Sequence, residues 1–510
     1  MGIIDRLQDQ KRRPHLHDRR IAIKAGYQGG MQSRILADMV TGLVSADTDL
    51  VWTLQTLRAR CRDLAINNDY VRKFLWMVVT NVVGPKGILL QAKMKDALGV
   101  LDKENNRDLE KAFFIWGQKK NCTVTGMNSW PSFQAQVIKT VARDGEIFIR
   151  KLEGFQNDFG FALQALEADY VDEFYNDKVK NIRMGIEYDS WRRPVAYYFR
   201  KLNIFDYQTT SYSSDYFRVP ASEVIHLFIQ ERPEQGRGAP WIATPMARLN
   251  ILGGYEEAEL VACRGSAAKM GFYESGAGDE YEGEKEDQEG NPIQEVEPGL
   301  LEKLPKGFKF IPYDPQHPTT QYGNFVKSCL RGISSGLLVS YNALANDLEG
   351  VNYSSIRQGV IDERDIWKIF QSWLIEHFHQ EVFEAWKSMA ILSGKIKKSI
   401  YEKMEPDDIR WQPRGWAWVD PSKDVDASRM EIESGLNSRG RILAETGEDF
   451  EDTLRELTEE DRLIKESGLT LSVTSSPKGT PMGQVNEDVV NQSPVWNRAR
   501  RRKEENAVPK

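Results

Sequence analysis

The stretch whose residue types and spacing most resemble a catalytic motif is Gly332-Ile333-Ser334-Ser335-Gly336. It matches the GxSxG turn, in which the central serine is the nucleophile of a hydrolase and a histidine is the base. That turn needs a strand before the serine, whereas residues 324–331 have the spacing of a helix. The downstream histidines, His377 and His379, fall within a predicted packed helix. The pattern therefore disfavours catalysis by Ser334, and a serine hydrolase remains one alternative hypothesis.

Metal and cofactor chemistry finds little support in the sequence. His377 and Glu381 lie four residues apart and share a face of a predicted helix, but no third or fourth ligand accompanies them. No GxGxxG follows a predicted strand, and no GxxxxGK[ST] phosphate loop occurs. The four cysteines form no CxxC pair: Cys61, Cys122, Cys263 and Cys329. We expect no metal, no cofactor and no enzymatic activity, and we interpret Cys61 and Cys263 as small buried residues.

Two basic runs lie near the ends of the chain. The first lies within residues 11–20 of an arm predicted over 1–45, and the second consists of Arg498, Arg500, Arg501, Arg502 and Lys503. Each run could contact nucleic acid or be a solvated terminus, so a monomeric nucleic-acid-binding module is a second alternative hypothesis. The net charge of −7 and the isoelectric point of about 5.7 argue against tight non-specific binding of DNA.

The bulk composition indicates an ordinary globular chain. With 510 residues, 40% of them hydrophobic and 28% charged, the chain can form two or more domains with a sizeable core. Its first residues lack the apolar core of a signal peptide, and no apolar run reaches the ~20 residues that span a bilayer. We therefore expect no membrane partner and synthesis in the cytosol.

The first half of the chain changes from helical to strand spacing. Helices are predicted from about Asp49 to Asn67, from a cap at Asp69 to Gly84, over 106–118 and from Ser129 to Asp144, with a strand over 87–92. Period-two alternation then predicts strands at 146–152, 162–166, 182–188, 196–202 and 223–228. This order predicts an α+β fold rather than a regular βαβ array.

The segment from Arg237 to Ser355 reads as an inserted hairpin. Thr244 and Pro245 can start a helix over 245–272, and an acidic segment at 274–290 follows. Short strands such as 308–311, a second helix over 322–339 and a polar loop over 340–354 come next. The acidic segment is a solvated tip or an electronegative rim for a basic partner. An exposed excursion of this kind is typical of an assembly subunit rather than of a compact catalytic pocket.

The last third of the chain is predicted to be mainly helical. An apolar-rich helix runs over 355–392, and a short strand lies within 407–419. Ends marked by Gly435, Gly440 and Gly447, with Ser438 and Asp449 as caps, predict three short helices over 421–434, 439–446 and 450–467. After Gly468 the composition turns to Ser, Pro, Gly and Asn, which predicts a tail without stable structure.

Four motifs, in consistent order, resemble the lambda-like family of tailed-bacteriophage portal proteins. They are Arg218 to Phe228, Arg237-Gly238-Ala239-Pro240-Trp241, Tyr353 to Arg357 and Val419 to Lys423, and the similarity covers about residues 50–468. The resemblance implies a homo-oligomeric ring of about twelve subunits at one vertex of the virion capsid. Double-stranded DNA would be packaged and ejected through its channel, without sequence specificity. The ring would have no catalysis of its own.

The family architecture implies a division of this chain by position. Residues 46–240 and 355–420 would form the wing, 241–272 and 322–340 the two stem helices, and 273–321 the clip. Residues 341–354 would form the tunnel loop, 421–468 a helical crown, and 1–45 and 469–510 a basic arm and tail. The implied partners are the large terminase subunit, a head–tail connector, and the major capsid and scaffold proteins, which meet the subunit in the host cytoplasm during assembly.

Five residues are candidates for the wall of the channel. Lys327 and Arg331 lie on the second stem helix, and Asp347, Glu349 and Asn352 lie on the predicted tunnel loop. Each could instead make a contact between subunits. Twelve copies would carry about −84 charges in total, and an acidic wall would let a polyanion slide rather than hold it.

Overall fold

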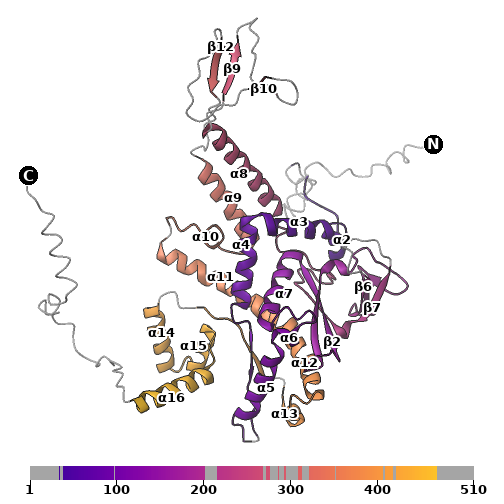
Figure 1. Ribbon diagram of the computed structural model, residues 1–510, viewed down its shortest axis with the longest axis vertical. Coiled ribbons are helices and arrows are strands. Elements are labelled where there is room, and N and C mark those ends of the chain that lie inside the picture. Colours follow the sequence, from indigo (N-terminus) through magenta and orange to yellow (C-terminus); the bar gives the residue numbers. More distant parts are fainter. Residues whose placement is uncertain are drawn as a thin grey trace, which may run out of the picture. The chain divides into compact units, whose positions relative to one another are not determined.

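The computed structural model describes residues 34, 38–96, 98–201, 215–267, 271–275, 285–286, 292–293, 308–312, 321–350, 352–405, 408–416 and 421–467 (Figure 1). The chain divides into two compact units, residues 1–447 and 448–510, and each is described by itself. Within the described residues no helix has the length and apolar character needed to cross a bilayer. Most of the acidic segment 274–290, and both basic runs, lie outside the described residues.

Helices from both ends of the first unit form its main core. The N-terminal helices are α2 (Ala46–Val51), α3 (Leu54–Asn67), α4 (Asp69–Val78), α5 (Lys103–Trp116), α6 (Lys119–Cys122) and α7 (Trp130–Asp144). Asn68, rather than the predicted Asp69, caps α4, because its side chain accepts a hydrogen bond from the N–H of Val71. The predicted stripe Phe74, Val78 and Val82 is buried, and it continues through a π-helical turn over Val79–Val83.

Two antiparallel sheets follow. In the first, β2 (Glu146–Glu153) lies between β3 (Phe161–Leu166) and β8 (Val224–Phe228). The second has the order β4 (Ile182–Arg183), β5 (Ile186–Tyr188), β6 (Pro194–Arg200) and β7 (Tyr216–Pro220). The single strand predicted over 182–188 is wrong: the chain reverses there at Gly185, which has a φ of 78°. Strand β7 was not predicted.

The C-terminal part of the first unit returns to this core. The predicted long helix consists of α11 (Tyr353–Leu374), a π-helical turn over Ile375–His379, and α12 (Gln380–Leu392). It is followed by α13 (Lys398–Lys403) and β13 (Ile409–Gln412), and β13 pairs with β1 (Leu89–Ala92). Helices α14 (Pro421–Glu433) and α15 (Arg439–Thr446) complete this unit. The second unit contains α16 (Phe450–Ser467), and all three C-terminal helices were predicted.

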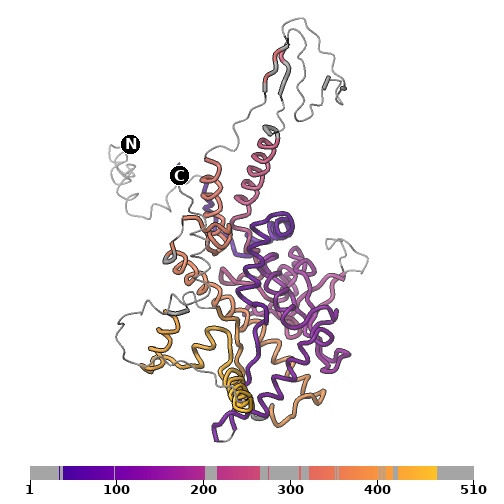
Figure 2. The backbone as a smooth tube through the Cα atoms, turned by 60° about the vertical axis from the view of Figure 1, so that its left-hand side comes forward, coloured from indigo at the N-terminus to yellow at the C-terminus, as the bar shows by residue number. Residues whose placement is uncertain are grey.

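The predicted hairpin is present between β8 and α10 (Tyr341–Ala345). Helices α8 (Met246–Ala267) and α9 (Tyr322–Gly336) run side by side (Figures 1 and 2), and Tyr255 stacks on Tyr322 with ring centroids 5.9 Å apart. Between them, β9 (Gly271–Ser275) pairs with β12 (Phe308–Pro312), and β10 (Lys285–Glu286) pairs with β11 (Pro292–Ile293). Cys263 on α8 is only half-buried, so the prediction that it is a buried residue is wrong.

Candidate functional site

The five predicted channel residues gather where α9 turns into α11. The predicted tunnel loop over 341–354 is not entirely a loop, because a short helix α10 (Tyr341–Ala345) begins it. The side chain of Ser340 caps this helix by accepting a hydrogen bond from the N–H of Ala343, and Leu344 is buried. Irregular backbone starts at Asn346, which adopts the left-handed conformation with a φ of 55°. We call residues 327–352 the corner.

Asp347 is the centre of the corner. Its carboxylate accepts hydrogen bonds from the Tyr341 hydroxyl at 2.6 Å and the Glu349 N–H at 3.0 Å, and Lys327 Nζ lies 3.0 Å away. These donors, the Tyr341 hydroxyl first, lower the pKa of Asp347 to about 2. Lys327 also lies 3.4 Å from Glu349, and its pKa is raised, chiefly by Asp347. One cation therefore faces two carboxylates.

The other two candidates also make local contacts. The Arg331 guanidinium lies over the ring of Tyr341, 5.4 Å from its centroid. Asn352 caps α11, because its side-chain oxygen accepts a hydrogen bond from the N–H of Ser355 at 2.8 Å. The structure thus brings Lys327, Arg331 and Asp347 together and gives Asn352 a structural role at a helix start. Their position against a channel remains a prediction.

Helix α4 supports this corner, which the sequence did not reveal. Lys73 donates a hydrogen bond to the side-chain oxygen of Asn346 at the start of the irregular backbone. One turn earlier, the Tyr70 hydroxyl donates to Glu256 of α8 at 3.0 Å. These pairs join residues that are more than 180 positions apart, so helical spacing alone could not have found them.

The hydrolase hypothesis does not agree with the geometry of Ser334. This residue is buried inside α9, and its hydroxyl donates to the carbonyl oxygens of Leu330 and Arg331 at 2.9 and 3.0 Å. Its glycine neighbours have packing roles: a Cβ at Gly332 would overlap the Arg248 guanidinium of α8, and one at Gly336 would touch Pro245 at 3.4 Å. The GxSxG match is a helix–helix contact, not a nucleophile turn.

Neither His377 nor His379 belongs to a metal site within the described residues. His379 is buried among aromatic rings, and its Nδ1 lies 3.1 Å from the carbonyl oxygen of Leu374. Burial lowers its pKa to about 4, so it is neutral at pH 7. In the part of the chain that the structure describes, no group of three or more His, Cys, Asp or Glu residues could hold a metal ion.

The motif that starts at Arg237 lies in a buried charge cluster. Glu146, the first residue of β2, is fully buried and receives Arg58 Nη2 at 2.7 Å and Arg237 Nη2 at 2.6 Å. Arg237 also donates to the carbonyl oxygens of Met184 and Ala168, at 3.0 and 3.2 Å. It therefore joins both sheets and the segment before α8. Sequence reasoning missed this cluster because Arg58 and Arg237 lie 88 and 91 positions from Glu146.

The electrostatics of the cluster keep Glu146 charged. Burial opposes its ionisation, but the charge of Arg237, the hydrogen bond with His226 and the charge of Arg58 outweigh this, and the pKa of Glu146 lies far below its usual range. His226 Nε2 lies 2.9 Å from Glu146, yet burial lowers the pKa of the imidazole. Gly238 is required here, since a Cβ would overlap the carbonyl oxygen of Gly145.

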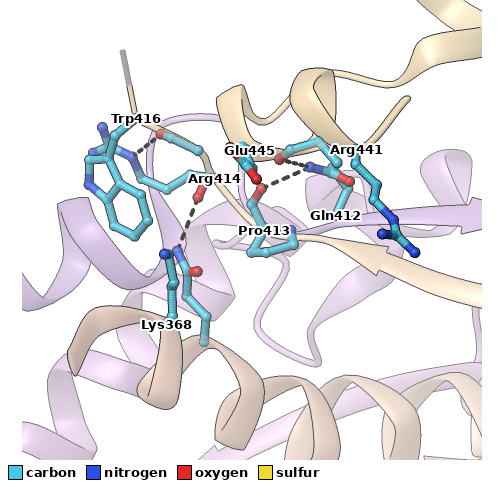
Figure 3. Close-up of a pocket in the computed structure, with 10 residues that line it drawn as sticks. Lys368, Gln412, Pro413, Arg414, Trp416, Arg441 and Glu445 are labelled. Carbon is cyan, nitrogen blue, oxygen red and sulfur yellow. Dashed lines mark hydrogen bonds between the residues drawn. The ribbon is translucent and has the colours of Figure 1, made fainter. Parts of the chain in front are cut away.

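A pocket lies between α11, the end of β13 and α15 (Figure 3). Gln371 donates to the carbonyl oxygen of Arg414 at 3.1 Å, and Gln412 donates to that of Ala444 at 2.9 Å. The backbones of Gly415 and Gly447 touch so closely that a Cβ at Gly415 would overlap Thr446. This arrangement attaches α15 to the long helix and offers no nucleophile or acid–base pair.

The chain is similar in sequence to known phage proteins. The family described as "Phage portal protein, lambda family" matches residues 32–371. A "Probable portal protein" of Halomonas phage phiHAP-1 is 38% identical over 426 residues, covering 81% of this chain and 82% of that protein. Portal protein B of Escherichia phage lambda is 26% identical over 158 residues, which is 29% of each chain.

A solved structure, the neck of an empty gene transfer agent particle, aligns with 81% of this chain and 98% of its own at 11% identity, with a TM-score of 0.41. Portal proteins of this family are structural components of the phage rather than enzymes, in agreement with the prediction of no enzymatic activity. On the extent of the family match and the identity to the Halomonas phage protein, this chain belongs to the lambda family of phage portal proteins.

Proposed function

We propose that about twelve copies of this chain close into a ring at one vertex of the capsid, and that double-stranded DNA enters and leaves through its centre. In this proposal the wing, stem, clip, tunnel loop and crown are the residue ranges given by the family resemblance. ATP hydrolysis belongs to a terminase that docks on the clip, and a head–tail connector binds the finished ring. The subunits meet the capsid and scaffold proteins in the host cytoplasm.

One uncovered surface of α8 carries the proposal. Among the exposed residues of this helix, five small or apolar ones follow a four–three repeat: Ala247, Ile251, Gly254, Ala258 and Val261. Ile251 and Val261 are 70% and 64% exposed, although neither is polar. A four–three apolar repeat is the seam of helices that pack along their length, and small residues let such helices approach closely. A seam left uncovered in the subunit is the surface expected to contact the next copy in a ring.

The charges at the corner suit a channel that does not grip DNA. Lys327 is held by Asp347 and Glu349, and Arg331 lies on the ring of Tyr341. Cations that are already paired bind phosphate groups less strongly than unpaired cations do. Any contact with the duplex would therefore be sparse and salt-sensitive. This agrees with a tunnel loop past which DNA slides.

The mass of the purified protein tests the proposal. Twelve chains of 58.4 kDa give a particle of about 700 kDa, measurable by native mass spectrometry and visible as a ring in negative stain. We expect Ile251→Glu to shift the population toward single chains, because it places a charge in the seam. The matched control is Leu392→Glu, an equally drastic change at a 78% exposed residue at the end of α12, which we expect to leave the ring intact.

One result would contradict the ring, and another would contradict only the seam on α8. Particles that remain at 58 kDa over the micromolar range would remove the ring itself. If the wild-type chain forms a ring but Ile251→Glu leaves it unchanged, the ring stands and α8 is not its seam. A monomer whose DNA affinity disappears on removal of residues 498–503 would instead support the nucleic-acid-binding module.

A further inference from the structure

The helix of the second unit has an apolar stripe that the described residues leave largely uncovered. Phe450, Leu454, Leu457 and Ile464 fall on one side of α16 at helical spacing. Leu454 and Leu457 are 51% and 56% exposed, and no residue of the helix is buried. The helix cannot owe its stability to packing of this stripe within the described residues. A stripe of this length is a surface for a further segment.

The charges of α16 indicate that a segment bound to this stripe should be cationic. Residues 448–467 contain nine carboxylates and three cations. Each cation pairs within the helix: Arg455 with Asp452, Arg462 with Glu459 and Glu466, and Lys465 with Asp461. Helical spacing places Glu460 next to Leu457 and Ile464 of the stripe and Glu456 one turn earlier on the same flank, and in the described chain no ion pair reaches either of them. Like charges at this spacing repel, and a cationic neighbour would relieve the repulsion.

A second copy of α16 is a poor occupant. The described residues 448–467 carry a net charge of −6, so two such helices would bring twelve excess negative charges together. The repulsion opposes pairing through a stripe that is only one or two residues wide. The surface instead fits a segment that has an apolar anchor followed by several cations.

We propose that the chain's own C-terminal segment, residues 495–503, covers α16. This segment begins with Val495 and Trp496 and continues with five cations and no carboxylate up to Lys503. The apolar pair matches the stripe, and the basic run matches the flank formed by Glu456 and Glu460. Its distance along the chain permits the contact: 28 residues separate Ser467 from Trp496 and can extend to about 90 Å. The helix itself is only about 27 Å long.

The contact withholds the basic run from nucleic acid. Arg498 to Lys503 is the densest basic run in the C-terminal half of the chain, and in this proposal the acidic α16 competes with nucleic acid for it. The competition weakens at high ionic strength, which screens charges on both sides. The inference needs a single subunit only, so it does not depend on how many copies form the ring.

Trypsin digestion of the full-length chain tests the contact. Cleavage within residues 498–503 is followed by mass spectrometry, with cleavage within the basic run 11–20 as the reference in the same sample. We expect slower cleavage of the C-terminal run at low salt, and a difference that shrinks at high salt. Removing the flanking charges with Glu456→Gln and Glu460→Gln should accelerate C-terminal cleavage about threefold to tenfold, since two surface ion pairs are lost.

The same helix offers a matched control. Glu459→Gln and Glu466→Gln make the same change of charge on the opposite side of α16, where both carboxylates pair with Arg462, and should leave the cleavage rate within twofold. Trp496→Ala should accelerate cleavage like the flank variant. Equal effects of both glutamate pairs, or no effect of the flank pair and of Trp496→Ala, would overturn the proposal. Amide exchange over 450–467 verifies that α16 is folded in each variant.

Discussion

The substitution Glu146→Gln tests the role of the buried charge cluster most directly. The amide has the shape of the carboxylate, so the packing around β2 is kept while one negative charge disappears. The side chains of Glu146, Arg58 and Arg237 are at most 1% exposed, so water cannot solvate the arginine charges that Glu146 no longer neutralises. Removing one partner of such a buried pair costs about 3–5 kcal/mol. At about 2 °C or more per kcal/mol, we expect the unfolding midpoint of the first unit to fall by at least about 6 °C.

The assay is thermal and urea unfolding, followed by tryptophan fluorescence, at pH 7. The control is Glu381→Gln, which makes the same change in an ion pair of 3.4 Å with Lys151, where the glutamate is 58% exposed. An exposed pair contributes about 0–1 kcal/mol, so the control should move the midpoint little. Because the pKa of Glu146 is depressed, its stabilisation is present above the unfolded value of about 4.3 and is lost as the pH falls below it. Equal midpoints for the two variants would refute this account of the cluster.

Three further predictions follow from other contacts. Burial lowers the pKa of His379 to about 4, below its unfolded value of about 6.5, so protonation of the unfolded chain reduces the free energy of unfolding as the pH falls from 6.5 toward 4. Urea unfolding at pH 7 and pH 4 should show that His379→Phe loses less stability over this range than the wild type, by up to about 3 kcal/mol. The buried His226, whose pKa is also lowered, accounts for part of the loss that remains in the variant. Gly238→Ala should prevent native folding, measured by melting and solubility, because its Cβ overlaps a backbone oxygen, whereas Gly253→Ala, with nothing within 4 Å, should be neutral or stabilising. Asp347→Asn should speed amide exchange over 341–352 without changing exchange in the sheets, because it weakens the contact with Lys327.

The sequence predicted elements whose ends carry local signals. Gly435, Gly447 and Ser438 delimit helices at the observed positions, because turns and caps depend on the residues themselves. The apolar stripe of α4 was also predicted correctly, because helical spacing is a local property of the sequence. Where the signal was ambiguous the prediction failed: residues 182–188 alternate like one strand, but Gly185 reverses the chain in the middle. The spacing of apolar residues did not predict the two π-helical turns, Val79–Val83 and Ile375–His379.

Long-range pairing could not be predicted from one sequence. Strand β1 pairs with β13 from the other end of the first unit, and Glu146 meets Arg58 and Arg237 across 88 or more positions. Nothing local distinguishes a charged residue that will be buried from one that will be solvated, since the difference depends on partners brought by the fold. The candidate site shows the same limit, because Lys327 and Asp347 were singled out separately and their contact was not foreseen.

The residues that reveal the family are those that hold the subunit together. Arg237 joins the two sheets by pairing with Glu146 of β2 and donating to the carbonyl oxygen of Met184 between β4 and β5. Gly238 permits the close passage of Gly145, and Trp241 stacks on Phe370 of α11 with centroids 4.6 Å apart. These positions tolerate few side chains, because each is fixed by a buried charge, a backbone contact or a ring stack. Ile251, which is proposed to face a neighbouring copy, is 70% exposed and under no such constraint within one chain, whereas Asp347 is held by Tyr341 and Lys327. The roles proposed for Ile251 and Asp347 therefore have to be tested on the oligomer, if one forms, rather than on the single chain.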